Sequence, residues 1–347
     1  MKKLIITLLC SVLIMCTVIG CGSKASSGSG ADNSDKTLKI VTTIFPEYDW
    51  VLNILGDKAA DCELTMLLDN GVDLHSYQPT AEDMLKISDC DMFIYVGGES
   101  DVWVEDALAE AANKDMAVIN LLETLGDSVK EEEVVEGMQE EDEHEHDEDA
   151  EEHEHEEDGE EHEHDGEEPE YDEHVWLSLR NAEVLCDAIA EGLAKIDPDS
   201  ADTYKANAKA YNDKLAALDG EYEKAVSSAV NKTVLFGDRF PFRYLTDDYG
   251  LSYYAAFVGC SAETEASFET IVFLAGKVDE LGLKTIFTIE KNDGRIAGTI
   301  RDNTTTQDQQ ILALDSMQSV TSEDVAAGTS YLSVMTDNLS VLKEGLK

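Results

Sequence analysis

The stretch Leu38-Lys39-Ile40-Val41-Thr42-Thr43 is predicted to form a strand, and it begins a regular alternation of strand-like and helix-like segments. The strand-like segments that follow are residues 62–67, 92–96 and 117–121, and the helix-like segments are residues 46–55, 79–87 and 101–112. Strands that alternate with helices predict a mainly parallel sheet with flanking helices. We therefore expect an N-terminal α/β lobe over residues 37–197.

A second alternation begins at Thr233-Val234-Leu235-Phe236. Its further strand-like segments are residues 252–257, 285–289 and 310–314, and its helix-like segments are residues 268–281 and 322–346. The same reasoning predicts a C-terminal α/β lobe over residues 231–347.

Between the two alternations, one long helix is predicted over residues 198–230, with Asp197 as its N-cap and Pro198 in its first turn. Apolar side chains follow at spacings of three and four residues: Tyr204, Ala208, Tyr211, Leu215, Leu218 and Tyr222. Such a helix would be roughly 45–50 Å long at about 1.5 Å per residue, which makes it a rigid connection between the lobes. A coiled-coil dimer needs more heptads than this segment holds, so a monomer is expected.

The charge of the chain restricts its partners. Among 347 residues, 75 are acidic and 25 are basic, which gives a formal net charge of −50. A chain this acidic does not bind nucleic acid unaided, so no nucleic-acid partner is expected.

The N-terminal segment predicts export. Lys2 and Lys3 precede an apolar run over residues 4–19, which is typical of a secretory signal and short for a membrane-spanning helix. Val18-Ile19-Gly20-Cys21 resembles the lipobox of bacterial lipoproteins, so residues 1–20 are expected to be the signal peptide and Cys21 the lipid anchor. Residues 21–36 would then be a flexible tether at the cell membrane. An ordinary signal peptide, in which Cys21 is incidental, is the alternative.

An acidic tract over residues 131–171 carries six of the eight histidines. They form three His-Glu-His groups: His144 and His146, His153 and His155, His162 and His164. The composition of the tract predicts a disordered loop, and its imidazoles and carboxylates predict weak, reversible capture of divalent metal. An acidic solubilising loop with incidental histidines is the alternative.

The remaining two histidines are expected to form a second, more specific metal site. His75 lies in the loop at residues 71–80, between a strand and a helix, where open α/β sheets bind their ligands. His174 lies where the acidic tract ends and the next helix begins. Together they are predicted to form a pair of imidazole ligands.

Four cysteines follow the N-terminal segment: Cys62, Cys90, Cys186 and Cys260. None forms a Cys-x-x-Cys pair, which excludes a zinc finger. Cys62 and Cys90 are compatible with a disulfide in an exported protein and equally with two buried thiols.

From about Leu38 to its C-terminus, the chain resembles the metal-specific solute-binding lipoproteins of bacterial ABC importers for zinc and manganese. The resemblance is carried by Gly-x-Asp-x-His-x-Tyr-x-Pro-Thr at 71–80, by Tyr95-Val96-Gly97-Gly98 with Trp103, by Asp-x-His-Val-Trp-Leu-Ser at 172–178, and by the histidine-rich insertion. It implies two α/β lobes joined by a long helix, with the metal held in the cleft by two histidines of the first lobe and two ligands of the second.

The family pattern assigns candidate ligands in this sequence. His75 and His174 match the first two ligands, and Asp315 matches the acidic fourth ligand. The family's third ligand is the first residue of a His-x-x-Phe-x-Tyr pattern, and here Arg239 occupies that place. Arginine stays protonated, so Asp238 is predicted to replace it, with the thiol of Cys260 as a less favoured alternative.

The resemblance predicts a binding protein that captures Zn²⁺, with Mn²⁺ as an alternative, and delivers it to an ABC permease and its ATPase. The chain contains neither a His-Glu-x-x-His helix nor a Gly-x-Ser-x-Gly elbow, so a metallohydrolase is not expected. A surface adhesin or an extracellular metal buffer, in which the acidic tract is the active part, is the remaining alternative.

Overall fold

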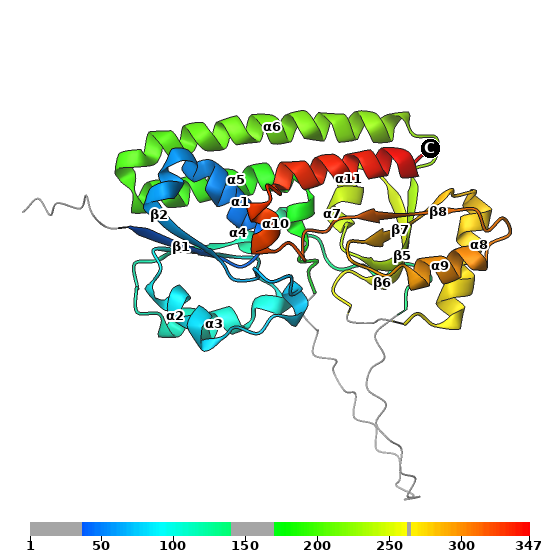
Figure 1. The fold of residues 1–347 in the computed structure, drawn as a ribbon, viewed down its shortest axis with the longest axis horizontal. Helices are drawn as coiled ribbons and strands as arrows, with labels where there is room; N and C mark the ends of the chain where they lie inside the picture. The colour runs from blue at the N-terminus through cyan, green and yellow to red at the C-terminus, as the bar shows by residue number, and fades with distance from the viewer. Residues whose placement is uncertain (1–36, 140–169, 262–264) are drawn as a thin grey trace, which may run out of the picture. The chain divides into compact units, whose positions relative to one another are not determined.

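The chain folds into two four-stranded parallel sheets in a computed structural model that describes residues 37–139, 170–261 and 265–347 (Figure 1). The first sheet has the order β2-β1-β3-β4, and its strands are β1 (Leu38–Thr42), β2 (Cys62–Met66), β3 (Met92–Tyr95) and β4 (Ala117–Asn120). The second has the order β6-β5-β7-β8, with β5 (Thr233–Phe240), β6 (Ser252–Val258), β7 (Thr285–Ile289) and β8 (Gln310–Leu314). All paired strands are parallel, which confirms the predicted α/β architecture.

Helices follow the strands in both halves of the chain (Figure 1). Those before the long helix are α1 (Phe45–Leu55), α2 (Ala81–Asp89), α3 (Trp103–Glu110), α4 (Leu121–Leu125) and α5 (Leu179–Ile196). Those after it are α7 (Arg243–Tyr249), α8 (Phe268–Leu281), α9 (Arg295–Asp302), α10 (Ser322–Ala326) and α11 (Tyr331–Gly345). None of the helices in the described part of the chain is both long and apolar enough to cross a membrane.

The long helix is α6 (Ala201–Ser228), which follows a short 3₁₀ turn at Pro198–Ser200. All six apolar residues of its predicted face are buried. Near its start, Tyr211 donates a hydrogen bond to Asp49 of α1 (3.0 Å), and towards its end Tyr222 donates to the backbone carbonyl of Met335 in α11 (2.6 Å). The helix is therefore hydrogen-bonded to α1, which follows β1 of the first sheet, and to α11, which comes after β8 of the second, as a rigid connection requires.

Side-chain caps explain where the helices nearest the histidines begin. The Thr80 hydroxyl accepts the Asp83 N–H (3.2 Å), and the Asp83 carboxylate accepts the Thr80 N–H (3.0 Å), which is a capping box at α2. The Ser178 hydroxyl accepts the Asn181 N–H (3.1 Å) at α5. Both caps lie a few residues after a predicted metal ligand, so each ligand belongs to a loop that ends at a defined helix start.

The tract at residues 131–171 is expected to be a disordered loop, but its two ends, residues 131–139 and 170–171, form defined contacts. Glu131 pairs with Tyr171 in an antiparallel bridge, and the Gln139 N–H donates to a backbone carbonyl of β6 (2.9 Å). The side chain of Met138 is buried. The average composition of the tract is acidic and does not indicate that this one apolar residue is buried. The burial of Met138 helps to hold the segment against the second sheet.

Several predicted features lie outside the described residues. These are the signal peptide and tether with Cys21, and the six tract histidines His144, His146, His153, His155, His162 and His164. The four cysteines that the structure describes are free thiols, so Cys62 and Cys90 do not form a disulfide.

A buried carboxyl in α1 predicts a pH-dependent stability. Burial raises the pKa of Asp49 to about 6, against the opposing hydrogen bond from Tyr211. An acid whose pKa is raised by folding stabilises the fold below its unfolded pKa and loses that contribution as the pH rises through the folded value. Ionised Asp49 should therefore cost about 3 kcal/mol above pH 7, since each pKa unit is about 1.4 kcal/mol.

Asp49→Asn is expected to remove this contribution, so that the variant loses less stability than the parent protein between pH 4.5 and 7.5. Urea unfolding of both proteins at the two pH values measures the difference. Exposed Asp199 provides the control, because Asp199→Asn should keep the pH dependence of the parent. Parallel stability curves for the parent and Asp49→Asn would refute the assignment.

Candidate metal centre

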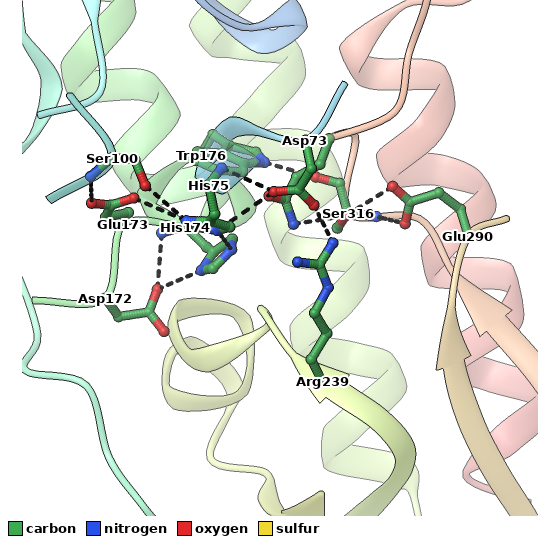
Figure 2. Close-up of polar contacts among 11 residues, drawn as sticks. Asp73, His75, Ser100, Asp172, Glu173, His174, Trp176, Arg239, Glu290 and Ser316 are labelled. Carbon is green, nitrogen blue, oxygen red and sulfur yellow. Dashed lines mark hydrogen bonds and ion pairs between the residues drawn. The ribbon is translucent and has the colours of Figure 1, made fainter. Parts of the chain in front are cut away.

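The first predicted ligand, His75, is positioned by the loop between β2 and α2. It lies in a 3₁₀ turn at Leu74–Ser76, and the Asp73 carboxylate caps this turn by accepting the His75 backbone N–H (3.0 Å). On the imidazole, Nδ1 lies 2.8 Å from Ser100 Oγ and 3.3 Å from Glu173 Oε2 (Figure 2). Because Nδ1 has these partners, Nε2 is the nitrogen left for a metal.

The second predicted ligand, His174, is fully buried at the start of the 3₁₀ turn Val175–Leu177. Asp172 Oδ1 accepts the backbone N–H of His174 at 2.9 Å and lies 3.1 Å from its Nδ1. A carboxylate only accepts hydrogen bonds, so Nδ1 carries the proton and Nε2 presents a lone pair. A second-lobe side chain holds this arrangement, since the Tyr244 hydroxyl donates to the Asp172 carbonyl (2.8 Å).

Glu173 is the buried carboxylate that orients His75. Burial opposes its ionisation, but hydrogen bonds from His75 and Ser100 outweigh this and hold the pKa of Glu173 below its usual range. Gly98 has φ +81°, and a Cβ there would lie 2.4 Å from Glu173 Oε1. Only glycine therefore allows both this backbone conformation and the close approach of the carboxylate.

The two imidazoles face each other through the nitrogens that are left for a metal. His75 Nε2 lies 3.2 Å from His174 Nε2 (Figure 2). Two nitrogen ligands on one tetrahedral Zn²⁺, each at about 2.0–2.1 Å, lie about 3.3 Å apart. The pair therefore has the spacing of two ligands to one metal ion, and each outer nitrogen has the carboxylate partner that is common for metal-binding histidines.

A third potential ligand comes from the second lobe. Single ligand atoms of His75, His174 and Cys260 all lie within 4.8 Å of one another, and this is the one such group among the described residues. Cys260 follows Gly259, where a Cβ would lie 2.9 Å from Cε1 of His174. The glycine lets the turn after β6 approach the imidazole this closely.

Arg239 occupies the place of the family's third ligand and forms an ion pair instead. It reaches from β5 to the carboxylate of Asp73, the residue that caps the His75 turn (Figure 2). Burial raises the pKa of Asp73, but the Arg239 charge and the neighbouring hydrogen bonds more than compensate, so this pKa is below its usual range. Arg239 thus stabilises the first-lobe loop without coordinating metal.

The structure does not bring the predicted ligands Asp238 and Asp315 to the two histidines. The oxygens of Asp238 accept the backbone N–H groups of Ile289 (3.0 Å) and Arg239 (2.9 Å), and Asp315 Oδ1 accepts the Met317 N–H (2.7 Å). The register of β5 shifts between Phe236 and Arg239, and such irregularities re-aim side chains. In this structure both carboxylates instead accept backbone hydrogen bonds in the second lobe, and their role as ligands stays a prediction.

An acidic pocket of about 280 Å³ opens beside the histidine pair. It is lined by His75, Ser100, Tyr171 and Cys260 together with four glutamates, Glu99, Glu132, Glu170 and Glu173. Glu132 and Glu170 lie near the two ends of the acidic tract, and the Glu132 N–H donates to the Glu170 carbonyl (2.9 Å). Negative charge at this opening favours the approach of a cation.

The comparison with known families agrees with this geometry. The family described as "ZnuA: Zinc-uptake complex component A periplasmic" matches residues 40–345. The chain belongs to the ZnuA family. This family is described as a periplasmic component of zinc uptake. The match confirms the resemblance that the sequence motifs predict.

The chain matches several relatives over nearly its whole length but covers different shares of their lengths. It is 31% identical to the zinc-binding lipoprotein AdcA of Streptococcus pneumoniae, over 99% of this chain but only 61% of that protein's length. It is 28% identical to the high-affinity zinc uptake system protein ZnuA of Bacillus subtilis, over 95% of this chain and 93% of that protein. The Zn(II)-bound ZnuA-like domain of S. pneumoniae AdcA superimposes with a TM-score of 0.66 at 28% identity, covering 90% of this chain and 99% of that domain.

Proposed function

We propose that this protein is the extracytoplasmic zinc-binding component of an ABC importer, which captures Zn²⁺ between its lobes and delivers it to a membrane permease. His75 and His174 are the central ligands. The observation that carries this proposal is the 3.2 Å spacing of their Nε2 atoms, with each Nδ1 beside a buried carboxylate. The ZnuA family match supports it, and so do the zinc-binding names of the relatives.

Zinc fits this arrangement better than manganese. Imidazole nitrogens suit zinc, whereas Mn²⁺ prefers carboxylate, carbonyl and water oxygens. The two carboxylates that would make the site oxygen-rich, Asp238 and Asp315, accept backbone N–H groups and lie outside the group formed by His75, His174 and Cys260. Binding and release need no bond to be made in a substrate, so no catalytic residue is assigned.

Metal analysis tests this function directly. The purified chain is expected to retain one equivalent of tightly bound zinc against a competing chelator, and to bind manganese far more weakly. Deleting residues 140–169 should remove additional weak equivalents and leave the tight one. If the deletion removed nearly all binding, the histidine-rich tract would be the functional part, as a metal buffer requires.

The lipid anchor and the permease complete the proposal. Cys21 would carry the lipid, and residues 21–36 would let the binding protein reach its permease. Cys21→Ala should release the protein from the membrane fraction and reduce zinc-limited growth while leaving zinc affinity unchanged. A variant that stays in the membrane fraction would refute anchoring through Cys21.

A further inference from the structure

We infer that the Sγ atom of Cys260 is the third protein ligand of the metal. The inference rests on the proposed function, because it concerns the same site and names the donor that the second lobe contributes. It starts from the placement of Cys260 within 4.8 Å of nitrogens of His75 and His174. Zn–S bonds of about 2.3 Å and Zn–N bonds of about 2.0–2.1 Å require ligand atoms roughly 3.3–3.6 Å apart, so a small closure of this group around an ion is sufficient.

The backbone before Cys260 brings this residue close to His174. Gly259 lies against the imidazole of His174, and a side chain at this position would lie 2.9 Å from Cε1 and 3.1 Å from Nδ1. The Ser261 N–H bonds to the Val258 carbonyl (3.4 Å), so Gly259 and Cys260 form a tight turn at the end of β6. The turn holds Cys260 beside the histidines instead of directing it into the apolar core.

The other second-lobe candidates are engaged elsewhere. Arg239 is paired with Asp73, and Asp238 accepts two backbone N–H groups. Within the described residues, Cys260 is the second-lobe side chain that joins the histidine pair in a metal-binding group. A ligand from this lobe lets the metal link the two lobes, and here a thiolate takes the role that the family gives to an imidazole.

Binding through Cys260 has a defined proton balance and a chemical consequence. The S–H bond breaks as the metal–sulfur bond forms, and the proton passes to solvent water. A thiolate is a soft donor that favours zinc over manganese. The loss of the family's third histidine therefore leaves the site selective for zinc.

Cobalt spectroscopy tests the assignment, because Co²⁺ bound to a thiolate gives an intense sulfur-to-metal charge-transfer absorption in the near ultraviolet. The parent protein with one equivalent of Co²⁺ should show this band, and Cys260→Ser should lose it. Residues 140–169 contain no cysteine, so the histidine-rich tract cannot produce the band. Cys62→Ser, which replaces another partly exposed free thiol, is the matched control and should keep the band.

Affinity measurements complete the test. The zinc affinity of Cys260→Ser should fall by more than about 100-fold, because the loss of a residue that only hydrogen-bonds to a ligand already costs about 10–100-fold. Manganese affinity should change much less, and an unchanged thermal unfolding profile without metal would show that the variant folds. A parent protein that binds one Co²⁺ through the histidines without a sulfur band would refute the role of Cys260 and leave the proposed function standing. If His75→Ala and His174→Ala both kept tight zinc binding, the proposed function itself would fail.

Discussion

Replacing His174 by alanine is expected to lower zinc affinity by more than about 100-fold. Losing a residue that only hydrogen-bonds to a metal ligand already costs about 10–100-fold, and losing the ligand itself should cost more. His75→Ala should have an effect of the same size. Both imidazoles present Nε2 to one point, 3.2 Å apart, so either substitution removes a ligand and the geometry that the pair defines. Competition with a zinc indicator measures the change.

A thermal measurement gives an independent readout of the same prediction. A ligand that binds only the folded state adds about 4 kcal/mol of stability at 1,000 times its Kd. Zinc should therefore raise the melting temperature of the parent strongly and that of either histidine variant little. His162→Ala in the tract is the control, and it should keep the full zinc-dependent shift. Histidine variants that retain the shift would place the tight site elsewhere.

The strand pattern was the strongest signal of the fold in the sequence. Parallel strands are covered on both faces, so they appear as continuous apolar runs such as Met92–Tyr95, where three of four residues are buried. Short helices were harder to predict. The eight residues of α9, Arg295–Asp302, bury only Ala297 and Ile300, and two apolar residues in so short a segment do not distinguish a helix from a strand.

The site was predictable where ligands belong to local motifs. His75 and His174 each lie in a loop whose residues match the family pattern, and the structure brings them together across 99 positions of sequence. The sequence favours Asp238 only because it neighbours the family's ligand position. The register shift in β5 that turns its carboxylate towards Ile289 has no signal in the sequence.

The groups that hold the ligands depend on long-range contacts, so the sequence did not reveal them. Ser100 and Glu173 are 73 positions apart, yet the Ser100 N–H donates to Glu173 Oε1 (2.9 Å) and both residues contact His75 Nδ1. Asp172 had a local signal, since it lies two residues before His174 within the family motif. A carboxylate two residues before a candidate histidine ligand is therefore a sequence signal for the group that orients it.

Glu173→Gln is expected to lower zinc affinity by about 10–100-fold, although Glu173 makes no bond to the metal. The buried carboxylate accepts from Ser100 through Oε1 and lies 3.3 Å from His75 Nδ1 through Oε2. Glutamine keeps one acceptor and replaces the other with an NH₂ donor. If its oxygen stays with Ser100, the NH₂ group faces Nδ1 and favours the tautomer that carries its proton on Nε2, which blocks the metal-binding nitrogen.

Glu99→Gln is the matched control for Glu173→Gln, because Glu99 is exposed and lines the same acidic pocket without an ion pair to His75. It should leave the tight affinity unchanged, so that any loss in Glu173→Gln reflects orientation of the imidazole rather than the charge of the pocket. Nitrogen NMR of His75 in both variants reports the tautomer directly. Equal zinc affinities and the same His75 tautomer in the parent and Glu173→Gln would mean that Ser100 alone orients this ligand.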